Sequence, residues 1–460
     1  MSTSLATLCA TKPAVGHGVP IGVGTWRLAV ELATPNDTTP GIWGYTKWNE
    51  AHWCDDTVWL DITCYISGIF TSRGGSSPAS VPTSALATLT LYDPDNSGLF
   101  AIWNAPYIAE GTPCRIVLHD PAGGATAWKA LYTGQIESLT EESPEAALGQ
   151  AVLPVLQLID PLADLASLDR TASAAVGAAD ASGTRLNRIL TNASWRWPIA
   201  TSLPTETDGS PAQSFGTTTL TGNALAEAQL TAFSVGKWFA TDPTGAARTY
   251  ARHPNTVAAL VPTGRAAPWV TTFGERRSTL TGTGRGAEVV PFAALKLWRD
   301  DEATVATVSL KRAAGASYQD HTGGCISGAT RSYSRSDLLG TLDTTVLDLA
   351  QHEWSLRDSS VVRAQIDIDA LQDPDLLPLV ADLDICQLVD LWREYALTAT
   401  PGRLFRLSTY RVEHRIAVLH TASTDTPSFT WRTKVHGAAV WNLPEGSPLS
   451  DTNIPYPYGG

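Results

Sequence analysis

One stretch of this sequence has the residue types that hold a calcium ion. In DPDNSG, Asp93 to Gly98, side-chain oxygens alternate along the chain before a glycine that permits a sharp turn. A complete calcium loop also needs a bidentate glutamate, at a position where this sequence has Asn104. A hairpin turn accounts for the same residues without an ion, and we favour that interpretation.

A second stretch, TGTGRG from Thr281 to Gly286, is rich in the glycines that let backbone N–H groups approach a phosphate. Its spacing differs from that of phosphate-binding loops. It also lacks the Lys-Ser/Thr pair that would hold phosphate and magnesium, and no helix is expected to follow it. The sequence therefore predicts a turn or flexible loop at this point.

Histidine and cysteine, the usual zinc ligands, show no metal-binding spacing. The nine histidines include no HExxH motif. His414 and His420 lie on one face of an expected strand, so a zinc pair stays open beside the favoured interpretation, ordinary surface or interface histidines. The cysteines form no CxxC pair, and scattered thiols in a long chain are usually buried small hydrophobes. They are Cys9, Cys54, Cys64, Cys114, Cys325 and Cys386.

Hydrolytic chemistry has no clear signal either. There is no GxSxG elbow, although a glycosidase pair of carboxylates could be far apart in the sequence. The chain has 16 Trp against 9 Phe, which is an unusual ratio. Such aromatics stack on sugars, but they also fill cores and protein interfaces, and the second use is favoured. Four of them crowd into one segment: Trp43, Trp48, Trp53 and Trp59. We therefore assign no residue as catalytic, cofactor-binding or metal-binding, and we expect no cofactor and no enzyme activity.

The composition indicates a β-rich globular protein of two to four domains. Of 460 residues, 43% are hydrophobic and 17% charged, and the chain has 37 Gly and 29 Pro, which argues against disorder and for many turns. A net charge of -13 argues against a surface that grips phosphate. The opening residues, MSTSLATLCATKPAV, lack the pattern of a secretory signal, and the most apolar region is too interrupted to span a membrane. The protein is therefore expected to be made in a cytosol without a signal peptide.

The elements that would position these residues follow from hydrophobic periodicity. From Gly22 to Asp160 the sequence pattern predicts strands separated by turns. Within it, DITCYISGIFTSRG (Asp61 to Gly74) reads as a strand with a slip near Gly68 and an end at Ser72-Arg73-Gly74.

Helical patterns appear further along the chain. Leu186, Ile189 and Leu190 share one helical face, Asn223 to Phe233 forms a second short helix, and a hairpin follows around Pro243-Thr244-Gly245. The clearest helix runs from Asp343 to about Leu356.

These patterns divide the chain into four parts. We expect an N-terminal β-barrel domain over residues 1–165 and a small α/β insert over 166–262. A second β-barrel domain follows over 263–440, with its helix near 343–356, and a C-terminal tail covers 441–460. The tail is expected to be poorly ordered or bound to a partner.

In their order and spacing, several of these stretches match a known family. The chain resembles the minor tail proteins that form the tail-tip hub (baseplate hub) of long-tailed, non-contractile phages, particularly those of actinobacteria. Four groups of stretches between Val58 and Val435 carry the resemblance. They are VWLDITCYISGIFTSRG with ALATLTLYDPDNSGLF; EGTPCRIVLHD with ALYTGQIESLTEE; TRLNRILTNASWRWP with GTTTLTGNALAEAQLTAFSVGKWFATDPTGAARTYARH; and YSRSDLLGTLDTTVLDLAQHEW with DICQLVDLW, YRVEHRI and FTWRTKV.

The resemblance implies a mainly β fold, with two tail-tube-like β-barrel domains and an inserted α+β module. It implies a structural role at the tail tip of a virion, as a homotrimer that presents six barrels to a sixfold ring of distal tail proteins. Other implied partners are the C-terminal end of the tape-measure protein, further minor tail or central fibre proteins and, indirectly, the host envelope. The hub would open during host cell entry, so that DNA passes at genome ejection without specific binding.

Two other functions stay open at this stage. One is a tip-associated hydrolase of cell-wall glycan, using carboxylates that no motif marks. The other is a sugar-binding receptor module built on the tryptophan-rich segment.

Overall fold

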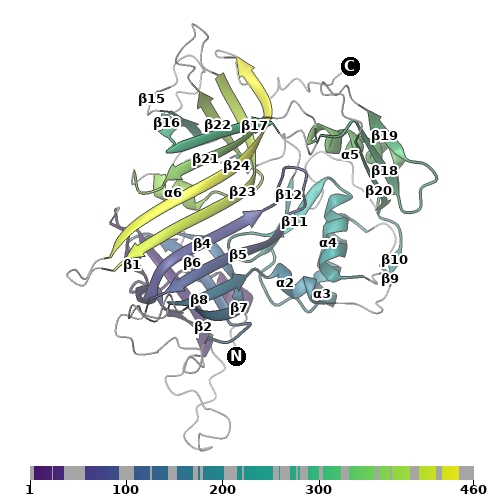
Figure 1. Cartoon of the computed structure of the whole chain (residues 1–460). Helices are drawn as coiled ribbons and strands as arrows, with labels where there is room; N and C mark the ends of the chain where they lie inside the picture. Colours follow the sequence, from purple (N-terminus) through teal and green to yellow (C-terminus); the bar gives the residue numbers. More distant parts are fainter. Residues whose placement is uncertain are drawn as a thin grey trace, which may run out of the picture.

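The fold is mainly β, with curled sheets flanked on one side by smaller modules that carry helices (Figure 1). Seventeen of the described strands join into one sheet. The computed structural model of the chain describes residues 5–22, 24–35, 57–92, 108–124, 127–142, 153–168, 175–176, 180–200, 215–219, 222–251, 258–259, 270–275, 278–279, 288–299, 304–322, 331–357, 362–372, 376–393, 403–420 and 427–444.

The N-terminal half of the large sheet curls around its own apolar face. Its central strand β2 pairs with β6 along one edge and with β1 and β3 along the other. The sheet then continues antiparallel from β6 through β7, β8 and β5 to β4. A short helix α1 (Leu5–Cys9) precedes it and a 3-10 turn η1 (Thr63–Tyr65) links β3 to β4. The strands are β1 (Val19–Pro20), β2 (Arg27–Pro35), β3 (Thr57–Asp61), β4 (Ile66–Gly74), β5 (Thr83–Leu91), β6 (Pro113–His119), β7 (Trp128–Glu142) and β8 (Leu153–Ile159).

The C-terminal half is built around two long strands, β23 (Arg403–Leu419) and β24 (Ser428–Pro444). From β24 the sheet continues through β21 to β17, and from β23 through β22 to β14 and β16. A short helix α6 (Leu376–Ala381) precedes β22 and is largely buried. The remaining strands are β13 (Ala258–Ala259), β14 (Thr272–Gly274), β15 (Ser278–Thr279), β16 (Glu288–Pro291), β17 (Ala294–Arg299), β21 (Val362–Asp369) and β22 (Gln387–Arg393).

Both halves share one hydrophobic core. Residues of the N-terminal strands, such as Ile69 and Leu89, belong to the same buried cluster as Val412 and Trp431 from the C-terminal strands. Because strand side chains alternate between faces, each half contributes every second residue to this core. The predicted mainly β fold is therefore confirmed, and its core is common to both halves.

The predicted helices of the insert are present. Helix α3 (Ser182–Asn192) buries Leu186, Ile189 and Leu190, as the periodicity indicates. They pack with α4 (Ala224–Phe233), with a short helix α2 (Leu162–Ala166) and with the predicted hairpin of β11 (Lys237–Thr241) and β12 (Ala247–Ala251). A small pair, β9 (Ala175–Val176) and β10 (Thr218–Thr219), accompanies them.

The predicted helix near the start of the last third is also present, as α5 (Asp343–Ser355). It packs on a separate three-stranded sheet rather than on the large one, with Val346, Ala350 and Trp354 facing Val308 and Leu310. That sheet consists of β18 (Thr307–Arg312), β19 (Gln319–Thr322) and β20 (Ser332–Leu338). The α5 module lies beside the insert in Figure 1, and Phe233 of α4 belongs to its core.

The C-terminal end differs from the expected domain boundary. Strand β24 continues to Pro444 because its last residues still pair with the first residues of β23. The sheet thus extends into the region assigned to the tail, and residues 445–460 lie outside the described ranges. No helix within the described ranges is long and apolar enough to cross a membrane.

Helix α4 offers a test of the insert's stability. Asn223 is its N-cap, and the side-chain oxygen accepts bonds from the backbone N–H groups of Leu225 and Ala226. Replacing a capping Asn by Ala removes these acceptors, so Asn223→Ala should lower the free energy of unfolding by about 1 kcal/mol. Asn192→Ala, at the exposed end of α3, is the matched control and should change it by less than about 0.5 kcal/mol. Denaturant unfolding of both variants measures the difference, and equal losses would contradict the capping role.

Candidate functional site: the joint between the two halves

Strand β23 belongs to both halves of the large sheet. One edge pairs with β24 along its whole length. On the other edge, Arg403 to Ser408 pair with β22, and Arg411 to Ala417 pair with β4 of the N-terminal half. The change of partner occurs at Tyr410, where the register of β23 shifts by one residue. A single strand therefore makes the two halves one continuous sheet.

The Ser72-Arg73-Gly74 motif lies at this change of partner. Gly74 has a φ of 108°, and a Cβ at this position would lie 2.1 Å from the carbonyl oxygen of Tyr410 and 2.9 Å from the Cα of Arg411. Only glycine permits an approach this close with a positive φ. Gly75 N–H then donates to the Tyr410 carbonyl at 3.0 Å. The glycine of the motif is thus explained by the joint.

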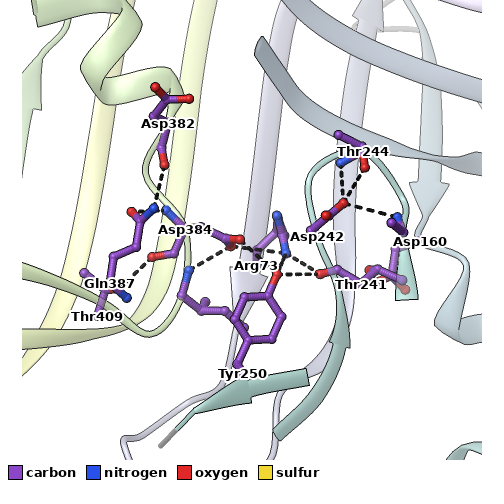
Figure 2. A network of polar contacts seen from close by, with 12 residues as sticks. Arg73, Asp160, Thr241, Asp242, Thr244, Tyr250, Asp382, Asp384, Gln387 and Thr409 are labelled. Atoms are coloured by element: carbon purple, nitrogen blue, oxygen red, sulfur yellow. Dashed lines mark hydrogen bonds and ion pairs between the residues drawn. The ribbon is translucent and has the colours of Figure 1, made fainter. Parts of the chain in front are cut away.

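Arg73, the middle residue of the motif, is buried and connects three parts of the molecule (Figure 2). Its Nη2 lies 3.2 Å from Oδ1 of Asp384, which precedes β22 in the C-terminal half. The same Nη2 donates to the main-chain oxygen of Thr241 and, at 3.3 Å, to the hydroxyl of Tyr250. Thr241 and Tyr250 belong to the β11–β12 hairpin of the insert. One guanidinium therefore holds both halves and the insert together.

The carboxylate of Asp384 is held in place by groups from all sides. The Tyr250 hydroxyl donates to its Oδ2 at 2.9 Å, and the N–H of Ile385 donates to its Oδ1 at 2.8 Å. The main chain of Asp384 is also fixed, because the Thr409 hydroxyl donates to its carbonyl oxygen at 2.6 Å. Gln387 accepts from the N–H of Asp384 at 2.8 Å and donates to the carbonyl of Asp382 at 3.0 Å.

The hairpin is tied back to the N-terminal half by a second carboxylate, Asp160. The Thr241 hydroxyl donates to its Oδ2 at 2.6 Å, and the N–H of Leu162 donates to its Oδ1 at 3.2 Å. Burial raises the pKa of Asp160 to about 6, against the lowering effect of these hydrogen bonds and of Arg73. At the tip of the hairpin, Asp242 accepts from Thr244 N–H at 2.9 Å and shapes the turn.

His414 is a further residue of β23, and its side chain is buried near Arg73. Its Nδ1 is 2.9 Å from the hydroxyl oxygen of Thr433, and its ring meets that of Trp431 edge to face. Burial, assisted by the positive charge of Arg73, lowers the pKa of His414 to about 3. The imidazole is therefore neutral when the protein is folded at neutral pH.

These groups fit a mechanical role better than a chemical one. Arg73, Asp384 and Tyr250 are buried and contact one another, and the buried Asp160 is hydrogen-bonded to Thr241 of the same hairpin. Among the described residues, no group of three or more His, Cys, Asp or Glu side chains could hold a metal ion. The arrangement is a polar joint that fixes three packed parts in one relative position.

The residues that the sequence offered as candidate metal or sugar ligands lie in different parts of the structure. His420 lies just beyond β23, where its Nε2 is 2.7 Å from the Ile66 carbonyl and its ring stacks on Tyr92, whereas His414 turns inward to Thr433. The structure therefore gives the zinc-pair alternative no support. Trp59 is buried and donates from Nε1 to the Leu8 carbonyl at 3.0 Å.

Of the cysteines that the structure describes, Cys9, Cys114 and Cys386 are buried and Cys64 is exposed. The remaining candidates lie outside the described residues: Asp93 to Gly98, Asn104, Thr281 to Gly286, Trp43, Trp48, Trp53, Cys54 and Cys325.

No protein-family model matches this chain, and no curated protein matches it significantly in sequence. Among solved structures, the tail protein from Neisseria meningitidis MC58 matches it with a TM-score of 0.50 and 10% identity, covering 90% of this chain and 96% of its own. This chain shares the fold of that tail protein. The 43 kDa tail protein of prophage MuSo2 from Shewanella oneidensis covers 89% of this chain and 97% of its own, with a TM-score of 0.49 and 11% identity.

Removing the charge of Arg73 tests the joint. Arg73→Met leaves the buried carboxylate of Asp384 without its partner, so the free energy of unfolding should fall by about 3–5 kcal/mol. Arg415→Met is the matched control at the same β23–β4 contact. Its side chain is exposed over Phe70, and its loss should cost less than about 1 kcal/mol. The double variant Arg73→Met/Asp384→Leu should recover part of the loss. Equal effects of the two single variants in denaturant unfolding would refute the role of Arg73.

The two shifted groups predict opposite dependences of stability on pH. His414 has a folded pKa below its unfolded value of 6.5, so it contributes stability that is lost as the pH falls below about 6.5. Asp160 has a folded pKa above its unfolded value of 3.8, so acidification from about 6 to about 4 stabilises the fold through this group. His414→Gln should therefore make the acid loss of stability shallower, and Asp160→Asn should make it steeper.

Unfolding free energies of the three proteins, each normalised to its own value at pH 7, measure these slopes. The slope that each group contributes is at most about 1.4 kcal/mol per pH unit. Variant slopes that match the parent slope within error would show that neither group titrates as described.

Proposed function

We propose that this chain is a structural protein of a phage tail. The observation that carries the proposal is the end-to-end match in fold to the Neisseria tail protein, which covers 90% of this chain and 96% of the other. If the two chains shared only a widespread β-sheet motif, the match would cover only one half of the large sheet. Coverage this nearly complete extends across both halves, which supports a common architecture rather than a common motif.

Within the tail, we place the chain in the tip hub. The support is the resemblance of its ordered sequence stretches to minor tail proteins of long-tailed, non-contractile phages of actinobacteria. The joint at Arg73 adds a physical reason, because it fixes two curled half-sheets of one chain as a single body. Three such chains, as a homotrimer, would present six related units to a sixfold ring of distal tail proteins. This resolves the mismatch between threefold and sixfold symmetry without six chains.

The remaining partners follow from this position. The hub would hold the C-terminal end of the tape-measure protein on one side and central fibre or other minor tail proteins on the other. On contact with the host envelope it would open and let DNA pass at genome ejection. A chain with a net charge of -13 repels phosphate, which favours passage of DNA over binding.

The two other functions considered from the sequence gain little. A sugar-binding surface would use the tryptophan-rich segment, but Trp59, its described member, is buried and engaged with Leu8. For a cell-wall hydrolase, the joint supplies no candidate acid–base pair, because its carboxylates Asp160 and Asp384 are buried and hydrogen-bonded to Thr241 and Tyr250.

Antibody-gold labelling of this protein on intact particles, viewed by electron microscopy, tests the proposal. Label confined to the tail tip is the expected result, with three copies per particle by quantitative mass spectrometry. An antibody against the main tail-shaft protein serves as the control for access along the tail. Label along the shaft would mean a tube role for the same fold. If washed, intact particles carry no label and contain no peptides of the protein, the tail role is wrong.

A further inference from the structure

The two long strands β23 and β24, which lie side by side in Figure 1, place two arginines directly opposite each other. Arg415 of β23 is the register partner of Arg432 of β24. Their chain neighbours Ile416 and Trp431 point into the shared core, so both arginines point away from it. Both side chains are exposed, that of Arg432 by 53%. The outward face of the sheet therefore presents two guanidinium groups from neighbouring strands.

This arrangement of like charges opposes folding. The Cβ atoms of directly opposed residues lie about 4.5–5.5 Å apart, and like charges at that separation repel. Each arginine contacts a neighbour on its far side. Arg415 lies over the ring of Phe70, 5.6 Å from its centre, and Arg432 forms an ion pair with Asp369 at 3.2 Å. Both contacts are exposed and therefore weak, so an anion bound between the guanidinium groups would convert their repulsion into attraction.

The surroundings of this pair are also rich in cations. Six outward positions of the two strands, which we term the arginine face, hold four Arg or Lys residues and one Glu. They are Arg411, Glu413 and Arg415 on β23 and Arg432, Lys434 and His436 on β24. In the whole chain, by contrast, 45 Asp and Glu outnumber 32 Lys and Arg. The balance of charge is therefore reversed on this part of the surface.

The two sides of the arginine face differ in charge. Toward β21, Asp367 lies opposite Lys434 and Asp369 lies opposite Arg432. Toward β4, the rows of outward side chains continue through uncharged residues. They include Phe70 and Ser72 on β4, Leu86, Thr88 and Thr90 on β5, and Gln157 on β8. Positive potential is therefore expected to extend from Arg415 over β4 and β5.

This composition favours a phosphate backbone over a protein as the partner. The centre of a protein interface usually buries aromatic or aliphatic anchors and is depleted of charge. Here Phe70 is covered by Arg415, and the exposed Leu86 lies two strands away on β5. Arginine forks match phosphate oxygens in geometry, and Ser, Thr and Gln side chains supply further hydrogen bonds to them. A nucleic acid presents such phosphates in a regular array.

We propose that the arginine face contacts the phosphate backbone of nucleic acid, with Arg415 and Arg432 as its central pair. The contacts are few and depend on charge, so binding is weak, independent of base sequence and lost as salt rises. The net charge of -13 keeps the affinity low, which suits contact with a moving strand better than retention. The inference rests on the tail role proposed above, which identifies the nucleic acid as the DNA that passes at genome ejection.

Fluorescence anisotropy of a labelled DNA duplex, titrated with the full-length chain, tests the contact. We expect saturable binding with a Kd on the order of 100 µM near physiological salt, equal for two duplexes of unrelated sequence. Arg415→Gln/Arg432→Gln should bind at least about tenfold more weakly at low salt, and its slope of log K against log salt should fall by about two. Arg196→Gln on the insert is the matched control, because Arg196 is 51% exposed and paired with Asp164. It should change the Kd by less than about twofold.

A variant of opposite sign separates the contact from any effect on folding. Asp369→Asn removes the carboxylate that competes for Arg432, so it should tighten DNA binding about two- to fivefold. A variant that had lost its fold would not bind more tightly. Circular dichroism and the denaturant midpoint show that each variant remains folded.

Three results would overturn the proposal. The first is a parent chain that does not bind DNA, and the second is a folded double variant that binds as tightly as the parent. The third is binding of a polyglutamate peptide but not of DNA, which would assign the arginine face to an acidic protein. A negative result here leaves the gold labelling of the tail unaffected. Absence from particles would likewise leave the measured DNA binding unaffected, so the two failures are distinguishable.

Discussion

The structure depends on one buried ion pair, Arg73 with Asp384. Removing two charges from water is costly, and their attraction compensates only when the geometry is good and the remaining polar atoms find partners. Here those partners come from a third region, the hairpin of Thr241 and Tyr250. The contacts of Arg73 Nη2 and of the Asp384 carboxylate therefore form only when both halves of the sheet and the insert are in place together. A long-range interaction of this kind specifies one arrangement of the parts more than it adds stability.

The pairing of β23 with β4, next to this ion pair, also protects a strand edge that would otherwise be exposed. A curled half-sheet leaves an unpaired edge that would pair with other chains, and β4 would be such an edge. In this chain β23 covers it, since it leaves β22 at the bulge of Tyr410 and continues along β4. Gly74 makes the transfer possible because any side chain would meet the Tyr410 backbone. One geometric requirement, that β23 must pass from β22 to β4, accounts for the protected edge, the bulge at Tyr410 and the Ser-Arg-Gly sequence.

Local features of the fold could be predicted from the sequence, and the joint could not. Helices α3, α4 and α5 and the β11–β12 hairpin follow from periodicity and turn residues, which act over a few positions. Ser72-Arg73-Gly74 was recognisable as the end of a strand, but its partners are distant: Thr241 is 168 residues from Arg73. Asp160, Tyr250 and Asp384 have no local pattern that marks them as partners. The contacts of Trp59 with Leu8 and of Arg115 with Thr11 could not be predicted for the same reason, since the alternation of their strands indicates only a half-buried sheet.

The continuous strand β23 also determines how the molecule carries force. Its backbone runs uninterrupted from one half to the other, so tension along it is borne by covalent bonds. Displacing β4 along its axis would load the seven paired positions between Arg411 and Ala417 simultaneously, in shear, whereas peeling would break them in succession. A body loaded in shear yields abruptly at a high threshold. Such a chain would transmit a pull applied at one half to the other with little stretch, as a stiff mechanical coupling rather than a spring.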